Sequence, residues 1–469
     1  MLDSLLASVS GVDTLPTDAS WGDVEKEMHI QTQATTREAK ASLATAALES
    51  MDFEESESVA WRKHHLRRYF HDRGGIWTVS RLSTVTKWVF VIVIGVLIAL
   101  IGLFVKFTTA QLVEFKFSLM HSYLESNTQS SYATAFFIFL FISQAFILAA
   151  CILCWFEPDA AGSGIPEIKA YLNGINLNKL VRIRVLVAKI LGMCFSCASG
   201  LPLGKEGPMI HAGSIVGAAV SQGKTITFGF DTSWTKFQDL RNDRSKRDFV
   251  TFGAAAGIAA AFSAPIGGIL FTLEEGASFW STTLTFRAFF CAMVTELTIN
   301  LLTSGVTIRN KNVLGLDQSV SMFDFGSFST FNGYHTYELL LFIVMGVLGG
   351  VLGAGFNYSV RRLLLFRRAR INQSTVLKIS ELLLLTGTFA VISFVLPLIS
   401  KGLACTTLPT QIASWSAQEQ VLLGKLVQFN CEDGQYNQLA SLYLVDADTA
   451  LQQLFHFTGS GDGRWVNDY

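Results

Sequence analysis

A lysine and a glutamate stand between glycines in the middle of strongly apolar sequence, within Gly204-Lys205-Glu206-Gly207-Pro208. An ionisable side chain at membrane depth is costly, so it normally faces a cavity, a partner or an ion path. Pro208 suits the first position of a helix, where its missing N–H costs nothing, and the glycines let the preceding backbone turn and approach a neighbour closely. We therefore expect a helix that begins inside the membrane, with the Glu206 carboxylate on its positive end.

Three segments share one pattern, in which small residues precede a proline at the start of a helix. They are Gly162-Ser163-Gly164-Ile165-Pro166, the segment above, and Ala261-Phe262-Ser263-Ala264-Pro265. Helix N-termini carry partial positive charge and unbonded N–H groups, so two or three that converge would bind an anion. The Ser163 hydroxyl adds one hydrogen bond without a full charge, which keeps binding weak enough for conduction. The alternative is that the glycines serve only helix packing, which a single motif would favour and three motifs disfavour.

The Glu206 carboxylate is itself an anion on a short tether. When ionised it can occupy the anion site and block the path, and when protonated it can swing away, so protons and anions compete at one place. The alternative is a Lys205–Glu206 ion pair that only offsets burial, although adjacent residues on a turn rarely face each other. His211 follows closely and titrates near neutral pH, but we interpret it as a hydrogen-bonded helix histidine.

Two adjacent glutamates, Glu274 and Glu275, end the apolar run from Gly267 to Leu273. Adjacent carboxylates repel each other unless one is protonated or solvated. A glutamate at a membrane–water boundary can take up protons for transport. A plain helix-end charge explains the pair equally well from the residues alone.

The composition is that of a polytopic membrane protein made of helices. Of the 469 residues, 50% are hydrophobic and only 16% are charged, a balance too apolar for an ordinary soluble protein. Apolar runs cover approximately 88–107, 133–156, 185–203, 207–221, 249–273, 284–304, 338–357 and 376–399. Gly, Pro and Ser interruptions join the second to fifth runs, and helices broken within the membrane mark binding sites in transporters. The sequence shows no nucleic-acid footprint and no nucleophile–base constellation, so we expect neither a nucleic-acid partner nor an enzyme.

The polar flanks predict the topology. Residues 1–60 have the composition of a disordered tail. Basic residues follow it directly before the first apolar run, at Arg62, Lys63, Arg67, Arg68, Arg73, Arg81 and Lys87. The positive-inside rule therefore places the N-terminal tail in the cytoplasm. Residues 401–469 form a polar segment that we expect in a lumen, where Cys405 and Cys431 could form a disulfide. The two Cys-x-x-Cys pairs lie in apolar runs without metal-site spacing, so we expect packing there and no metal.

At these motifs the sequence resembles the CLC family of chloride channels and chloride/proton exchangers. Gly162–Pro166 matches the family's GSGIP, Gly204–Pro208 its GKEGP, and Gly267–Glu275 its glycine-rich helix that ends in paired glutamates. Three flanking segments most resemble the endosomal and lysosomal branch, namely Ile168–Gly174, Lys246–Phe249 and Glu274–Trp280.

The resemblance implies an all-α polytopic membrane fold of CLC-type inverted repeats, with broken helices that meet at mid-membrane. It implies that Ser163 coordinates chloride, that Glu206 is the external gating glutamate and that Glu275 is the internal proton-transfer glutamate. The anion-binding set that the motifs carry over is Gly162, Ser163, Gly164, Ile165, Pro166, Gly204, Lys205, Gly207 and Pro208.

The function that the resemblance implies is chloride/proton antiport, a voltage-dependent anion transport across endosomal or lysosomal membranes. The family forms homodimers with one anion path per subunit, so chloride, protons, membrane lipid and a second copy are the expected partners, with an accessory membrane subunit as a further one. Channel members commonly lack the acid at the Glu275 position, which favours an exchanger over a passive chloride channel.

Several family features have no match in this chain. The second repeat of the family contributes a GxFxP motif and a later coordinating tyrosine, and neither is found. The CBS nucleotide-binding modules are missing too, so we expect no cofactor. We interpret 61–330 as the first repeat with its basic pre-helix segment, 331–400 as the start of the second, and 401–469 as a polar loop and truncated end. A further alternative is therefore a non-conducting membrane protein that acts as an interaction partner.

Overall fold

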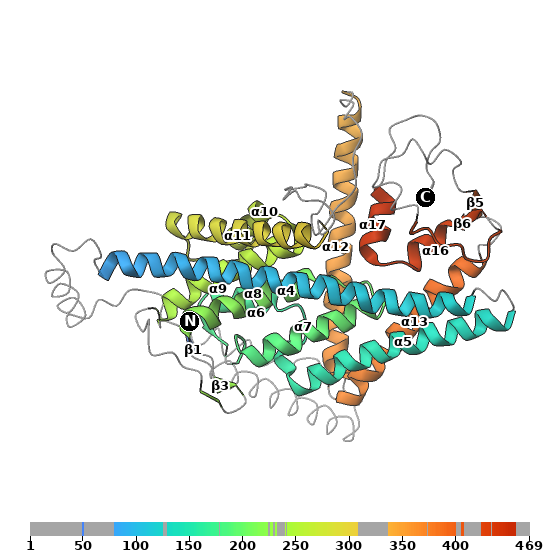
Figure 1. The fold of residues 1–469 in the computed structure, drawn as a ribbon, viewed down its shortest axis with the longest axis horizontal. Coiled ribbons are helices and arrows are strands. Elements are labelled where there is room, and N and C mark those ends of the chain that lie inside the picture. The colour runs from blue at the N-terminus through green and yellow to red at the C-terminus, as the bar shows by residue number, and fades with distance from the viewer. Residues whose placement is uncertain are drawn as a thin grey trace, which may run out of the picture.

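The computed structural model describes residues 49–50, 79–124, 129–177, 179–223, 226–227, 230–231, 240, 242–307, 336–372, 374–399, 405–407, 424–432 and 434–455. Helices dominate this part of the chain (Figure 1). The longer ones are α4 (Val79–Leu124), α5 (Gln129–Phe156), α7 (Ile183–Ala198), α8 (Glu206–Gln222), α9 (Asp243–Phe262), α11 (Thr282–Thr307), α12 (Glu338–Arg370) and α13 (Thr375–Ile399). The shorter ones are the 3-10 helix η1 (Pro158–Ala160), α6 (Ile165–Leu172), α10 (Pro265–Phe271), the π-helix η3 (Thr272–Gly276), α16 (Gln438–Tyr443) and α17 (Ala447–Phe455).

In the described part of the chain, six short strands form three antiparallel pairs. β1 (Glu49–Ser50) pairs with β2 (Ile175–Asn176), β3 (Ile226–Thr227) with β4 (Phe230–Asp231), and β5 (Cys405–Thr407) with β6 (Gln435–Asn437). None of these pairs builds a larger sheet, so the described fold rests on helix packing.

Five of the described helices are long and apolar enough to cross a membrane: α4, α5, α11, α12 and α13. The apolar runs near 185–203 and 207–221 instead form α7 and α8, which have 16 and 17 residues. The run near 249–273 is divided between α9 and α10 by a break at Ser263 and Ala264. Because a straight span needs about 20 residues, these segments are the helices that stop and restart, as the sequence predicted.

Glycines interlock α8 and α9 at the centre of the core. A Cβ atom on Gly213 would collide with the backbone of Gly253, and one on Gly257 would lie 2.5 Å from the Met209 carbonyl oxygen. Both helices carry these glycines at a spacing of four residues, which brings backbones together in membrane helices. The alanine-rich stretch 253–261 of α9 is buried throughout. The two helices therefore form one rigid unit, which holds the start of α8.

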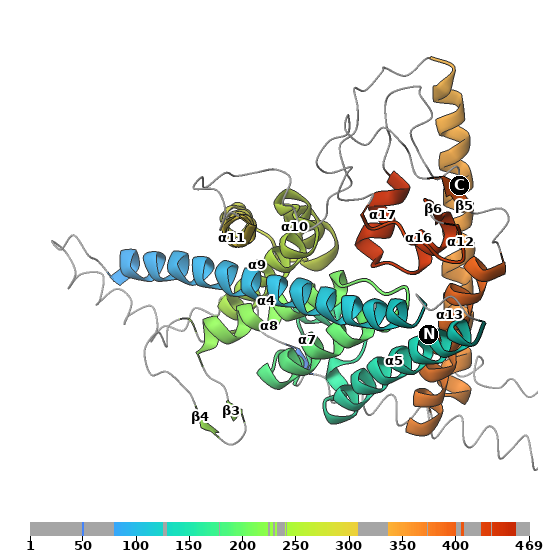
Figure 2. The ribbon, with the colours of Figure 1, turned by 45° about the vertical axis from the view of Figure 1, so that its right-hand side comes forward.

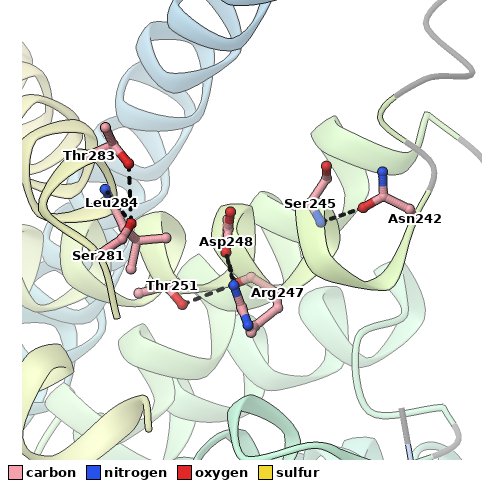
Figure 3. A network of polar contacts seen from close by, with 8 residues as sticks. All are labelled: Asn242, Ser245, Arg247, Asp248, Thr251, Ser281, Thr283 and Leu284. Atoms are coloured by element: carbon pink, nitrogen blue, oxygen red, sulfur yellow. Dashed lines mark hydrogen bonds and ion pairs between the residues drawn. The ribbon is translucent and has the colours of Figure 1, made fainter. Parts of the chain in front are cut away.

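Polar contacts fix the first half of α9 (Figure 3). The Asn242 side chain caps the helix by accepting from the Ser245 N–H at 2.6 Å, an arrangement that satisfies one otherwise unbonded N–H. Arg247 is buried, pairs with Asp248 at 2.7 Å, and places its guanidinium 5.2 Å from the Phe279 ring. The charged segment at the start of α9 is thus tied to the chain that follows η3.

The far end of α4 packs against the C-terminal segment of the described chain. Residues 424–455, here called the cap, contain β6, α16 and α17, which lie beside the end of α4 and beside α13 (Figure 2). The cap contributes Phe429 and Leu444 to a cluster with Met120 of α4 and Phe394 of α13. A disulfide joins Cys431 of the cap to Cys405, the pair named from the sequence.

The α12 helix differs from the rest, because it has no buried residue. It carries a row of apolar side chains and five glycines that meet nothing within 4 Å. It also continues to Arg370, beyond the apolar run that ends near 357, so the arginines at 361–370 belong to the helix. Arginines are good helix formers and stabilise a helix C-terminus.

The structure refines two boundaries drawn from sequence. Glu49 and Ser50 lie in the segment expected to be disordered, yet their backbone pairs with Ile175 and Asn176. The remaining residues of 1–60 lie outside the described part of the chain, as does the proposed repeat boundary at 330. The polar segment 401–469, expected to be a loop, contains the helices of the cap.

Candidate functional site

Two of the three predicted helix starts meet at one place. A Cβ atom on Gly207, in the first turn of α8, would lie only 2.7 Å from the Ser163 Cβ. Ser163 stands just before α6, and its Oγ accepts from the Ile165 N–H at 3.4 Å. A side chain larger than that of glycine would not fit there, so Gly207 allows the start of α8 to contact the loop around Ser163, here called the serine loop. The unbonded N–H groups of two helices are thereby close to one exposed hydroxyl.

The serine loop needs glycine on both sides of Ser163. Gly162 and Gly164 have φ angles of +78° and +83°, a left-handed conformation that other residues adopt only with strain. Gly164 also packs against the His211 ring so closely that a Cβ atom would collide with it. The loop is therefore held from the α8 side at two points, Gly207 and His211.

The Glu206 side chain folds back toward the start of its own helix. It is the first residue of α8, and its half-buried carboxylate lies against Gly204, where a Cβ atom would collide with Oε2. A negative charge there is stabilised by the partial positive charge of the helix start. The carboxylate therefore lies beside Gly204, against the residues that lead into α8.

The prediction that Pro208 is the first helical residue is wrong. The helix begins two residues earlier at Glu206, with Lys205 as its N-cap, so Pro208 is its third residue. The difference is small in energy, because the N–H groups of the whole first turn lack acceptors within the helix. Likewise Pro166 is the second residue of α6, after Ile165.

The third helix start packs elsewhere. Pro265 is the first residue of α10, and Gly268 lies against α9, where a Cβ atom would be 2.5 Å from the Ala255 carbonyl oxygen. Ser263 before it has a positive φ of 53°. Among the described residues, α10 and α6 meet in an apolar cluster around Ile210, through Phe271 and Ile165. Among the described contacts, the predicted convergence therefore involves two helix starts.

Two buried polar residues lie beside the serine loop, and the sequence interpretation named His211 but not Lys189. Lys189 of α7 is buried and its Nζ donates to the Gly162 carbonyl at 3.2 Å. His211 is fully buried, and its Nε2 lies 3.1 Å from the Leu180 carbonyl oxygen, the hydrogen-bonded arrangement expected for it. The signal in the sequence was a lysine inside the apolar run at 185–203. A buried ammonium is costly, so it normally faces a partner, a cavity or an ion path.

Glu275 lies on the π-helix at the end of α10, next to α6. Its Oε2 accepts from Lys169 Nζ at 2.8 Å, and both side chains are exposed. This hydrogen bond, followed by the lysine charge, holds the pKa of Glu275 below its usual value. The sequence had singled out Glu274 and Glu275 without choosing Lys169 as a partner, because the two segments are distant in the chain.

A large cavity lies on the Glu206 side of the helix starts. Its volume is about 2120 Å³, and we call it the chamber. Gly204, Lys205 and Glu206 line it, together with the second half of α4 and with the cap. The predicted residues therefore fall into two groups. One group lies at the two helix starts, where Gly204, Lys205 and Glu206 line the chamber, and the other is Glu275, which is held by Lys169.

Comparisons with known proteins place this geometry among ion transporters. Residues 145–458 match the family model described as "Voltage gated chloride channel". The chain is 37% identical over 418 residues to the "H(+)/Cl(-) exchange transporter 7" of Homo sapiens, covering 88% of this chain and 49% of that protein. It is 34% identical over 447 residues to "Chloride channel protein C" of Dictyostelium discoideum, covering 94% and 56%. The chain thus spans about half the length of the curated relatives it matches.

A solved structure shares the fold. The crystal structure of a slow cyanobacterial Cl-/H+ antiporter covers 79% of this chain and 76% of its own, at 21% identity and a TM-score of 0.52. The all-α polytopic architecture with broken helices is therefore shown by the fold as well as by the sequence family.

Proposed function

Because this chain belongs to the voltage-gated chloride channel family, we propose that it serves in chloride/proton exchange across an intracellular acidic membrane. Support comes from its similarity to exchangers of the transporter 7 type, at 36–37% identity. The endosomal or lysosomal location, the homodimeric state and an accessory membrane subunit are parts of the same proposal. So is a cytoplasmic N-terminus, which the basic residues before α4 favour.

One observation carries the proposal: the start of α8 touches Ser163 while Glu206 folds back over that start. Chloride would bind between the α6 and α8 starts, where N–H groups and the serine hydroxyl offer weak hydrogen bonds. Ionised Glu206 competes with chloride for the same partial charge. Protonation removes that attraction and frees the place for chloride, so the binding of one proton and the binding of one anion are coupled there.

Glu275 would exchange protons with the opposite solution. It is exposed, and Lys169 keeps it ionised by a direct hydrogen bond. A proton that reaches Glu275 must displace this contact before it moves on toward Glu206. The pairing therefore gives the proton path an acceptor that is anionic at neutral pH.

The test is flux in proteoliposomes that contain the purified chain. An imposed chloride gradient should drive proton movement against a pH gradient. Glu275→Ala should abolish proton movement while chloride still flows, and Glu206→Ala should leave chloride flow uncoupled from pH. Glu274→Ala is the matched control, because it removes the neighbouring carboxylate. Chloride flux without any proton movement in the unmodified chain would instead identify a passive channel.

A second candidate is a non-conducting membrane partner. The α12 helix favours it, because an apolar helix of 33 residues with none buried is suited to packing against another protein. Absence of flux from the folded chain, together with its co-purification with a co-expressed full-length exchanger, would support this candidate over transport.

A further inference from the structure

A buried lysine of α4 lies beside the chamber. The Lys116 side chain is only 2% exposed, and its Nζ donates to the Ala198 carbonyl at 2.9 Å. The ammonium also lies 5.0 Å from the Phe117 ring centroid and 5.2 Å from that of Phe139. Ala198 is the last residue of α7, where a cation is stabilised by the partial negative charge of the helix end.

The contact with Ala198 leaves most of the donor capacity of Lys116 unused. An ammonium has three N–H donors and the carbonyl takes one. Among the residues that the structure describes, no carboxylate forms an ion pair with Lys116. A buried ammonium without a counter-charge is unfavourable unless something else neutralises it. Two aromatic faces offset part of this cost, but neither provides a full negative charge.

Nothing bulky separates Lys116 from the loop that leads to Glu206. Gly200 has a φ of +94°, and a Cβ atom on it would lie 3.1 Å from Lys116 Nζ. Lys116, Gly200 and Glu206 all line the chamber. The buried cation and the tethered carboxylate therefore share one cavity, the cation on α4 and the carboxylate on the start of α8.

We propose that Lys116 forms a second anion subsite, in the chamber, where a small monovalent anion such as chloride is held before it replaces the Glu206 carboxylate. This inference rests on the proposed transport function. The subsite uses the two remaining N–H donors of Lys116 and supplies the missing negative charge. It differs from the site at Ser163, which is built from helix starts without a full positive charge.

A purely structural role for Lys116 gives a different expectation. If Lys116 only neutralises the end of α7, its loss lowers thermal stability but leaves the affinity for chloride unchanged. If it also holds an anion, its loss weakens chloride binding on the chamber side. The two roles can therefore be distinguished by measuring how flux depends on chloride concentration.

The experiment compares Lys116→Gln with Lys106→Gln, which removes a charge from the same helix and the same chamber wall. Initial proton-coupled flux is measured against chloride concentration in the solution that faces the chamber. Lys116→Gln should raise the half-saturating concentration roughly fivefold to tenfold, the size expected for one partly screened charge contact. Lys106→Gln and Lys116→Arg should stay within about twofold of the unmodified chain. Lys106 is ten residues or about 15 Å along the helix from Lys116, beyond the screening length, and Lys116→Arg retains the charge. Equal half-saturation in Lys116→Gln and Lys106→Gln would overturn the subsite.

A second measurement does not depend on the folding of any variant. Crystals of the unmodified chain soaked in bromide should show an anomalous peak beside Lys116 Nζ in addition to one beside Ser163. A peak beside Ser163 alone would overturn the subsite and leave the transport function standing. Failure of the transport function itself would appear differently, as loss of proton coupling in the unmodified chain.

Discussion

The α8–α9 pair and α12 carry the same small-residue spacing with opposite results. Gly213 and Gly217 of α8 meet the backbone of α9, whereas Gly349 and Gly353 of α12 meet nothing within 4 Å. Glycines four residues apart allow close backbone contact, but they do not create it. In α8 and α9 the contact serves the site, because it fixes the helix start that holds Glu206.

The comparison also shows that apolar character and burial are separate properties in this chain. The α12 helix is apolar enough to span a membrane and has no buried residue, while α8 is too short for a straight span and is buried along most of its length. Lipid or another protein can satisfy the first kind of helix. The second kind is covered by the chain itself, since α8 packs against α9.

The largest expected effect tests the interlocked glycines. Gly253→Val places a branched side chain into the Gly213 backbone, which cannot move aside. We expect a loss of more than about 4 kcal/mol, the range of severe core changes, and therefore no folded protein in size-exclusion chromatography. Gly349→Val on α12 is the matched control and should melt within a few degrees of the unmodified chain. Similar melting of both variants would remove the distinction between the two helices.

A medium effect is expected at the cap. Cys431→Ser opens the disulfide to Cys405 and should cost about 2–4 kcal/mol of cap stability, because the open chain gains conformational freedom. Limited proteolysis should show faster cleavage within 424–455 but unchanged protection of α8 and α9. Cys154→Ser, which removes a free thiol, controls for the substitution itself. Loss of protection in α8 would mean that the cap and the core are one cooperative unit.

A functional effect without large destabilisation is expected at Gly207. In Gly207→Ala the new methyl group would push against Ser163, since a separation of 2.7 Å from the Ser163 Cβ is too short for two carbons. We expect chloride flux to fall about 10-fold to 100-fold, as misplacement by an ångström does at reaction sites. Gly192→Ala, on α7 with open space around it, should conserve flux. Normal flux in Gly207→Ala would show that the two helix starts need not touch.

The smallest effect is expected at the exposed Lys169–Glu275 pair. The lysine lowers the pKa of Glu275, so the contact is complete above the ordinary carboxyl pKa and is lost as pH falls through the lowered value. Lys169→Gln should therefore move the acidic limb of proton flux to higher pH. The exposed Lys179→Gln serves as the control, and an identical shift in both variants would rule out the direct contact as the cause.

The sequence was sufficient to name the candidate site residues but not to predict which of them contact each other. The motifs at Gly162–Pro166 and Gly204–Pro208 identified Ser163 and Glu206, because turns and helix starts leave a local record in glycine and proline. The contact between Ser163 and Gly207 left no such record, since it joins segments distant in the chain. Lys189 could be noticed as a charge in an apolar run, whereas Lys116 lies between two such runs. The carbonyl partners of both lysines depend on how α4 and α7 pack.

Helix ends and exposure were the least predictable features. The apolar run that corresponds to α12 ends near 357, whereas the helix continues to Arg370. The expected start of α8 at Pro208 is two residues later than its actual start at Glu206. Neither hydropathy nor spacing distinguished α12 from buried helices, because burial depends on neighbours that a local pattern does not contain. The pairing of Glu49–Ser50 with Ile175–Asn176 was missed for the same reason.

A π-helix at Thr272–Gly276 carries two adjacent carboxylates, Glu274 and Glu275. Its wide turn is closed by a hydrogen bond from the Ala277 N–H to the Thr272 carbonyl at 3.0 Å, five residues apart. Such a turn holds one residue more than an α-helical turn, and one residue corresponds to a rotation of about 100° in the helical register. Within this turn Glu275, and not Glu274, forms the described ion pair with Lys169. A one-residue deletion in the turn would therefore change the direction of the Glu275 side chain and should break its contact with Lys169.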